Sequence, residues 1–246
     1  MRVGIFDSGI GGLTILKSLI DELPNNEYIY FGDTANLPYG SKTTNQLKTL
    51  ADKNINFLLS QKVEVIIIAC GTISSTIYDE IKENYEVPII DIINPIVDSL
   101  KNTKIKKALL IATEKTIQSK VFYEKLSTVI EEVYTKECPK FVPIIEHKTK
   151  DNLDITIAEY LYDFKNQDIE IIIPGCTHYP IIGEEISEYL EIPILDIGLS
   201  VASKIKLDYS IKDVKLYFSE INEDLKEVVK DIIGDYEIEE KTLDNS

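Results

Sequence analysis

The sequence predicts an α/β protein built from two similar halves, each holding a parallel sheet. Short apolar runs alternate with amphipathic stretches of helical length along the 246 residues. Strands that alternate with helices form parallel sheets covered by helices on both faces. The pattern also restarts midway along the chain, with matching motifs 106 residues apart. Such sheets bind ligands beyond the carboxyl ends of their strands, so we expect an active site in the cleft between the halves.

The first half contains four apolar runs that predict buried strands and three amphipathic stretches that predict helices. In chain order these are a strand at Val3–Phe6, a helix at Leu13–Glu22, a strand at Tyr28–Phe31, a helix at Thr43–Ser60, a strand at Val63–Ala69, a helix at Ile73–Glu83 and a strand at Pro88–Ile92. The turn after the first strand reads Asp-Ser-Gly-Ile-Gly-Gly. Its small residues let backbone amides approach an anion at the helix start.

The second half repeats this alternation. The predicted elements are a strand at Ala108–Ala112, a helix at Phe122–Val133, a strand at Phe141–Ile145, a helix at Ile155–Lys165, a strand at Ile169–Ile173, a helix at Ile181–Leu190 and a strand at Ile192–Leu195. A last strand at Val214–Phe218 and a last helix at Glu223–Ile233 can pack on either half. We therefore expect a first half at 1–95, a second half at 96–206 and a closing segment at 207–246 that can join the first half.

Three pairs of motifs indicate the duplication. The run Gly-Ile-Phe-Asp-Ser around Asp7 corresponds to Leu-Ile-Ala-Thr-Glu around Thr113. Glu-Val-Ile-Ile-Ile-Ala-Cys, which ends at Cys70, corresponds to Glu-Ile-Ile-Ile-Pro-Gly-Cys, which ends at Cys176. Val-Pro-Ile-Ile-Asp and Ile-Pro-Ile-Leu-Asp form the third pair. One pair alone would be weak, because buried strands resemble one another, but three pairs at nearly one offset favour a repeat.

The composition excludes several classes of partner. The chain has 26 Lys and Arg against 42 Asp and Glu, a net charge of −16, which disfavours nucleic acids and anionic membranes. The longest apolar run, Val65–Cys70, is far shorter than the roughly 20 residues of a membrane span. Asp7 stands where a signal peptide would need its apolar region, and an odd number of cysteines is typical of a reducing cytoplasm. We therefore expect a cytoplasmic protein with free thiols; a homodimer remains open.

The repeat places one cysteine in each half, just after a buried strand and just before a helix. A helix start stabilises anions and lowers the pKa of a thiol. Cys70 and Cys176 are also each followed within two residues by a hydroxyl, at Thr72 and Thr177. A single cysteine after an apolar run is usually a small buried hydrophobe, which is what we expect of Cys138. Two cysteines at matched positions favour a function.

Other chemistries fit these residues less well. A zinc site made of Cys70, Cys176 and His178 has suitable ligand types, but the Cys-x-His spacing is awkward and no further ligand cluster occurs. A cysteine phosphatase needs an arginine after its cysteine, and a cysteine hydrolase leaves the second cysteine unexplained. A dinucleotide site could use Asp33, but Thr14 stands where the last glycine of that fingerprint belongs.

Two facing thiols suit the inversion of a carbon stereocentre. One thiolate removes a proton from one face of the carbon while the opposite thiol donates a proton to the other face. The carbanion needs close donors and a dry cleft. An amino acid carboxylate could be held by helix-start amides and by Ser8, Thr72 and Thr177. His178 would support the nearby thiol as an acid or base, and Asp7 could either cap the following helix or accept a thiol proton. The predicted reaction uses no cofactor and no metal.

The motifs resemble those of glutamate racemase, a cofactor-independent isomerase that supplies the D-amino acid D-glutamate for peptidoglycan and the bacterial cell wall. The similar runs are Phe6–Thr14, Tyr30–Ala35, Pro38–Gly40, Ala112–Ile117, Phe141–Glu146 and Gly175–Pro180. The resemblance implies that Cys70 and Cys176 are the two acid/base thiols, with Asp7 supporting the first and with Glu146 and His178 supporting the second. It implies a substrate site lined by Asp7, Ser8, Tyr39, Gly40, Gly71, Thr72, Thr177 and His178, with Thr113 and Thr116 close by.

Gly71 departs from the family, which has asparagine at this position. A lost hydrogen-bonding group can cost about 1–3 kcal/mol if its partners stay unpaired. We also expect the glycine to open space in the site. The sequence therefore leaves open a weakened glutamate racemase, a racemase for a different or larger amino acid, and a paralogue that binds an amino acid without turnover. If the protein is a glutamate racemase weakened by the missing asparagine amide, Gly71→Asn should raise kcat/KM for glutamate by about tenfold.

Overall fold

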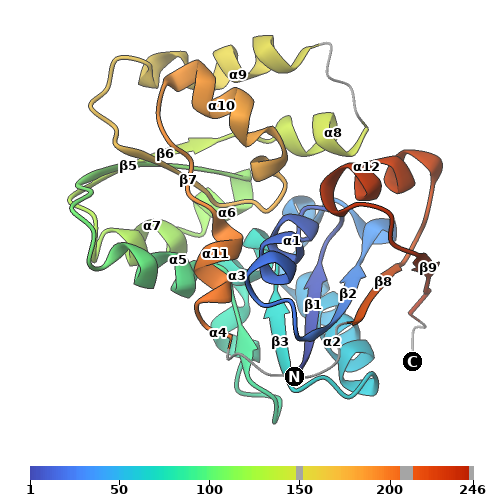
Figure 1. Cartoon of the computed structure of the whole chain (residues 1–246). Coiled ribbons are helices and arrows are strands. Elements are labelled where there is room, and N and C mark those ends of the chain that lie inside the picture. The colour runs from blue at the N-terminus through green and yellow to red at the C-terminus, as the bar shows by residue number, and fades with distance from the viewer. Residues whose placement is uncertain (148–151, 206–212, 244–246) are drawn as a thin grey trace.

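The computed structural model describes residues 1–147, 152–205 and 213–243. Figure 1 shows two lobes, each built around its own parallel sheet. The predicted α/β fold with two sheet-bearing halves is confirmed. Within the described ranges, no helix has the length and apolar character needed to cross a membrane.

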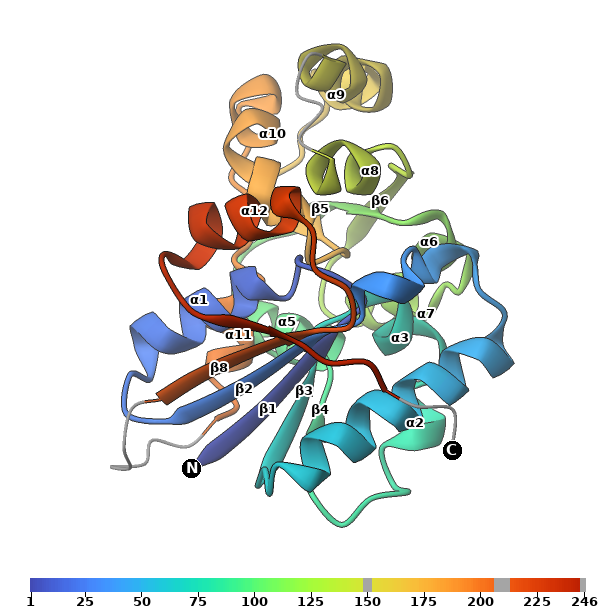
Figure 2. The same ribbon diagram turned by 90° about the vertical axis from the view of Figure 1, so that its right-hand side faces the viewer.

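The first sheet has the strand order β4-β3-β1-β2-β8-β9, and all neighbouring strands are parallel. Its strands are β1 (Arg2–Asp7), β2 (Glu27–Gly32), β3 (Val65–Ile68), β4 (Ile89–Ile90), β8 (Asp213–Phe218) and β9 (Ile238–Glu240). Helix α1 (Leu13–Glu22) lies on one face of this sheet and α2 (Thr44–Ser60) on the other (Figure 2). Successive residues of a strand point to opposite faces, so Ile5 joins the core on the α1 side and Phe6 the core on the α2 side.

The second sheet has the order β6-β5-β7, again parallel. Its strands are β5 (Lys107–Ala112), β6 (Glu132–Glu137) and β7 (Ile171–Pro174). The predicted strand Ile192–Leu195 contributes a single parallel bridge, between Ile194 and Ile172. The closing strand β8 pairs with β2 and therefore extends the first sheet; the expected junction at 206/207 lies outside the described residues.

Short helices connect these strands and cover the sheets. They are α3 (Gly71–Thr76), α4 (Tyr78–Ile81), α5 (Ile93–Leu100), α6 (Glu114–Gln118), α7 (Val121–Leu126), α8 (Phe141–Glu146), α9 (Leu153–Leu161), α10 (Gly183–Leu190), α11 (Ile197–Ala202) and α12 (Glu223–Ile233). Turns of 3₁₀ helix occur at Thr34–Asn36, Tyr39–Ser41, Tyr162–Phe164 and Tyr179–Ile182. Helix α11 packs against α1 and α5, so the chain crosses between the lobes here.

Two predicted elements of the second half are wrong. The segment Phe141–Ile145 is not a strand but most of α8, where Phe141 and Ile145 are buried on one helical face four residues apart. The predicted helix Phe122–Val133 is too long, because α7 ends early and the chain then enters β6. Strand β6 lies at the edge of the sheet and its side chains are largely half-exposed, so no apolar run marks it.

Candidate active site

The loops that follow β3 and β7 meet between the lobes. Cys70 follows β3 and Cys176 follows β7, so the two residues occupy corresponding places in the two sheets. Both side chains are buried, and both line one cavity of about 230 Å³. The structure thus brings together the two cysteines of the repeat, whereas Cys138 is buried in the core of the second lobe and does not line the cavity.

The cavity gathers most of the predicted substrate-binding residues. Its walls include Asp7, Ser8, Tyr39, Gly40, Gly71, Thr72, Thr113, Thr177 and His178. Thr116 does not line it but contacts the Thr113 hydroxyl, with the two oxygens 3.0 Å apart. A larger cavity of about 630 Å³ lies between α1, α8, α10 and α12 but contains no cysteine. The thiol chemistry therefore places the candidate site in the smaller cavity.

Several residues of the cavity walls were not predicted from the sequence. They include Leu37, Pro38, Lys115, Val142 and Pro143. The amine of Lys115 donates a hydrogen bond to the backbone carbonyl of Lys42 at 2.7 Å. Lys115 lies in the first turn of α6, in the Thr-Glu-Lys run after β5 that corresponds to the Asp-Ser-Gly turn after β1. That correspondence was the available signal for a lysine at the site.

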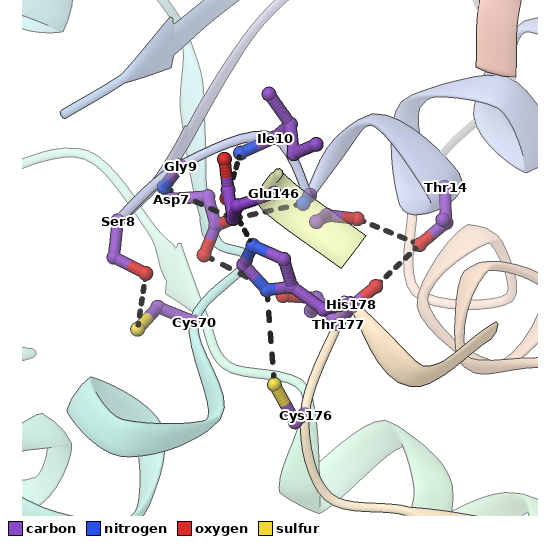
Figure 3. Close-up of polar contacts among 12 residues, drawn as sticks. Asp7, Ser8, Gly9, Ile10, Thr14, Cys70, Glu146, Cys176, Thr177 and His178 are labelled. Carbon is purple, nitrogen blue, oxygen red and sulfur yellow. Dashed lines mark hydrogen bonds and ion pairs between the residues drawn. The ribbon is translucent and has the colours of Figure 1, made fainter. Parts of the chain in front are cut away.

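Cys70 faces the turn that follows β1. Its Sγ lies 3.8 Å from Ser8 Oγ, a contact drawn as a dashed line in Figure 3. Burial raises the pKa of the Cys70 thiol to about 12, and the nearby Asp7 carboxyl acts in the same direction. The expectation that a helix start lowers the pKa of this thiol is therefore wrong, because desolvation outweighs the hydrogen bond from the backbone of α3. Cys70 is a protonated thiol at neutral pH.

Asp7 ends β1 and links the two lobes. Its Oδ2 accepts hydrogen bonds from the backbone N–H groups of Gly12 at 2.9 Å and Gly9 at 3.4 Å, and its Oδ1 accepts one from Thr177 Oγ1 at 3.5 Å. The side chain is fully buried, and this burial raises the pKa of Asp7, although the charge of His178 and the backbone donors oppose it. A carboxyl group with a raised pKa is suited to exchange a proton beside Cys70.

On the other side of the cavity, His178 connects Cys176 to Glu146 (Figure 3). The His178 Nδ1 atom lies 3.7 Å from Cys176 Sγ, and Nε2 lies 2.5 Å from Glu146 Oε1. Helix α8 carries Glu146, whose Oε1 also accepts a hydrogen bond from the backbone of Ile10 at 3.5 Å. Burial opposes protonation of His178, but its hydrogen bonds to Cys176 and Glu146 outweigh burial and raise its pKa well above the usual value. An imidazolium therefore faces the sulfur of Cys176.

Hydroxyl groups occupy one wall of the cavity. Thr72 Oγ1 lies 3.4 Å from Thr113 Oγ1, and the Thr113 side chain also caps α6. Tyr39 lines the cavity, but its hydroxyl donates to Asp33 Oδ2 at 2.5 Å and accepts from Asn54 at 3.1 Å, so this oxygen is engaged in a buried network. Asp33, which the dinucleotide alternative would use to bind a ribose, is itself buried in this network.

Gly71 does not open space in the site. A Cβ atom on Gly71 would lie 2.0 Å from the carbonyl oxygen of Gly175, in the opposite lobe. The expectation of extra room for a larger substrate is therefore wrong, because the backbone of the second lobe fills that place.

The zinc alternative gains no support from the geometry. Across 1–147, 152–205 and 213–243, no group of three or more His, Cys, Asp or Glu side chains is arranged to hold a metal ion.

Comparison with known proteins places this site in a family. A family model described as Asp/Glu/Hydantoin racemase matches residues 14–204. The chain belongs to this family. The glutamate racemase of Hydrogenobaculum sp. is 37% identical over 95% of this chain and 93% of its own length. That of Aquifex aeolicus is 34% identical over 98% of this chain and 97% of its own length.

Solved structures agree with this assignment. The glutamate racemase of Francisella tularensis in complex with D-glutamate is similar at a TM-score of 0.87 and 33% identity, covering 100% of this chain and 98% of that one. The enzyme of Thermus thermophilus in complex with β-chloro-D-alanine is similar at a TM-score of 0.84 and 30% identity, covering 98% of this chain and 97% of that one. The family and the two-lobed fold that the sequence motifs imply are both confirmed.

Proposed function

We propose that this protein interconverts L-glutamate and D-glutamate without a cofactor and supplies D-glutamate for peptidoglycan. The observation that carries the proposal is the pair of buried thiols, Cys70 and Cys176, that reach one cavity from corresponding positions of the two lobes. Acid/base groups from opposite lobes can act on opposite faces of one carbon. The relatives named glutamate racemase, one of them bound to D-glutamate, support glutamate as the substrate. A cytoplasmic location and a homodimeric assembly belong to the same proposal.

In the L-to-D direction, the thiolate of Cys176 takes the α-proton of L-glutamate. The electron pair of the broken C–H bond stays on the α-carbon and spreads into the adjacent carboxylate. The Cys70 thiol then delivers its proton to the opposite face, which forms D-glutamate. Cys176 has gained one proton and Cys70 has given one up, the α-carbon has exchanged one C–H bond for another, and proton exchange with water restores the starting protonation. The D-to-L direction runs the same steps backwards, with Cys70 as the base.

The environment of each thiol fits its starting role. The pKa of about 12 keeps Cys70 protonated as the acid. The imidazolium of His178 stands 3.7 Å from Cys176 Sγ and stabilises negative charge on that sulfur, which makes Cys176 the base. Glu146 holds His178 in this state through Nε2. In the first lobe the charge of Asp7 instead raises the pKa of the Cys70 thiol, and Ser8 Oγ lies 3.8 Å from its sulfur.

The walls supply donors for the substrate carboxylates. Ser8, Thr72 and Thr177 place hydroxyl groups around the cavity, and Lys115 adds a positive charge to it. Negative charge grows on the α-carboxylate as the proton leaves, so donors fixed around the cavity stabilise the transition state more than the ground state. The lining also includes Tyr39, Gly40 and Thr113, and the hydroxyl of Thr116 contacts that of Thr113.

The test is racemisation in D₂O by protein that has been dialysed against a chelator, with no cofactor added. Each enantiomer of every proteinogenic amino acid is incubated and analysed for optical rotation and for deuterium at the α-carbon. We expect glutamate to racemise and to acquire deuterium. Cys70→Ser and Cys176→Ser should each abolish racemisation, whereas Cys138→Ser, at a buried position outside the cavity, should keep it.

Three results would overturn the proposal. Full racemase activity of either Cys70→Ser or Cys176→Ser would exclude the two-thiol mechanism. If the protein carries one equivalent of zinc and loses its activity when the chelator removes that zinc, a metal enzyme would be favoured. Binding of glutamate, seen as a shift in melting temperature, without deuterium uptake would favour a binding protein.

A further inference from the structure

The two thiol residues are each next to a glycine, and these glycines touch across the cleft. Gly71 directly follows Cys70, and Gly175 directly precedes Cys176. A Cβ atom added to Gly71 would lie 2.0 Å from the carbonyl oxygen of Gly175 and 3.1 Å from its carbonyl carbon. Both obstructing atoms are backbone atoms, so no side-chain rotation can move them away. The separation of the two lobes beside the thiols therefore depends on the missing side chain of residue 71.

The Gly175 side of this contact cannot easily retreat. Its backbone N–H donates to the carbonyl of Ile111 in β5 at 2.7 Å. A Cβ atom on Gly175 would itself lie 2.8 Å from Ala112 Cβ and 3.0 Å from Leu110 Cδ1, so the loop is pressed against the second sheet. A side chain at position 71 would have to push the whole lobe, or shift α3, to find room.

Glycines line the same junction at a second loop. A Cβ atom on Gly11 would lie 2.7 Å from the backbone nitrogen of His178, and one on Gly9 would lie 2.6 Å from Glu146 Oε1. The first lobe thus meets the second through the bare backbone of the turn after β1 and of the turn after β3. Gly9 and Gly11 lie in the turn after β1, and Gly71 lies at the start of α3. The contact of Gly71 with Gly175 is the one placed next to both thiols.

We infer that Gly71 is a positioning residue that sets how closely Cys70 and Cys176 approach the substrate from the two lobes. The inference rests on the proposed racemase function and refines it. Real Cβ atoms essentially never come within 3.0 Å of such a neighbour, against the 2.0 Å found here, so any side chain at 71 must displace the second lobe or α3 by about 1 Å. A misplacement of about 1 Å at reacting groups can cost roughly 100-fold in rate.

A missing amide and a positioning role of Gly71 predict opposite effects of the Gly71→Asn substitution on kcat/KM. If Gly71 only lacks an amide, Gly71→Asn should raise kcat/KM for glutamate and Gly71→Ala should leave it unchanged. If Gly71 positions the lobes, both variants should lower kcat/KM by tenfold or more, because both carry a Cβ atom. Gly183→Ala is the matched control, since a Cβ atom on Gly183 in α10 would meet only the Ile194 side chain at an ordinary 3.5 Å. This control should keep wild-type activity.

A second measurement separates positioning from unfolding and does not need activity. Each protein is treated with iodoacetamide at low concentration, and the rates of alkylation of Cys70, Cys176 and Cys138 are followed by peptide mass spectrometry. We expect Gly71→Ala and Gly71→Asn to increase the rates at Cys70 and Cys176 at least several-fold while Cys138 stays protected. Reaction of all three cysteines would indicate unfolding, and the measurement is then repeated with Gly71→Ala at lower temperature, where Cys138 is protected.

A gain in kcat/KM for Gly71→Asn with no change for Gly71→Ala would overturn the inference. Unchanged alkylation rates at Cys70 and Cys176 in folded variants would overturn it as well. Failure of the racemase proposal itself has a separate signature, namely a wild-type protein that does not racemise any amino acid while the alkylation rates still respond to the substitutions.

Discussion

The negative charge of Glu146 should control the protonation of His178 beside Cys176. Glu146→Gln keeps the size of the side chain but removes the carboxylate, whose Oε1 lies 2.5 Å from His178 Nε2. Hydrogen bonds to charged groups contribute about 1.5–3 kcal/mol. If the full contribution is present in the transition state, its loss lowers kcat/KM by roughly 10- to 150-fold. We therefore expect a decrease in this range at pH 7.

The same substitution has a direct spectroscopic signature. The chain contains two histidines, so a ¹H NMR titration resolves His178 once a His147→Asn variant assigns the signals. The hydrogen bond to Glu146 raises the pKa of His178, so its titration in Glu146→Gln should move to lower pH. Glu159→Gln is the control, because Glu159 pairs with Lys140 on an exposed surface, where such pairs contribute about 0–1 kcal/mol. Unchanged kcat/KM and an unchanged titration in Glu146→Gln would refute the reasoning.

Two further predictions concern the stability of buried polar groups. Burial raises the pKa of Asp7, so the wild-type protein loses stability as pH rises through that pKa; Asp7→Asn should raise Tm at pH 7, and the difference should shrink toward pH 4, while racemisation falls. A Tm at pH 7 no higher than wild type would contradict this. Tyr39→Phe removes the donor 2.5 Å from Asp33 Oδ2 and should lower the free energy of unfolding by about 1–3 kcal/mol in urea titrations. An unchanged unfolding midpoint would mean that this buried hydrogen bond adds no net stability.

Much of the fold follows from local patterns that a single sequence contains. The apolar runs of β1, β2, β3, β5 and β7 are buried on both faces, which is why they stand out from their surroundings. Strand β6 has no such run, because its side chains are only half-buried at one edge of the sheet, whereas β7 at the other edge is joined by a parallel bridge to Ile194. The run Phe141–Ile145 looks like a strand because it is short and apolar, and periodicity cannot separate a short buried helix from a strand.

The candidate site, like the fold, was predictable from the sequence only in part. The matched positions of Cys70 and Cys176 were visible because a repeat in sequence becomes a correspondence in space. The role of Glu146 beside Cys176 came only from the resemblance to a family, and its contact with His178 was not predicted, because nothing in the sequence relates α8 to the loop after β7. The close approach of Gly71 to Gly175 depends on how the two lobes dock, which no local pattern encodes.

The central claim is that each thiol acts on one face of the substrate, and a reaction that needs a single base tests it most directly. In 3-chloroglutamate, removal of the α-proton by one thiolate breaks the Cβ–Cl bond, forms a double bond and releases chloride, so the second thiol is not required. Racemisation cannot make this distinction, because the enantiomers have equal free energy and kcat/KM is the same in both directions. We predict that Cys70→Ser releases chloride only from the L-configured analogue and Cys176→Ser only from the D-configured analogue. The two-thiol account would be contradicted if both variants failed to release chloride from the same enantiomer, or if either variant released chloride from both enantiomers.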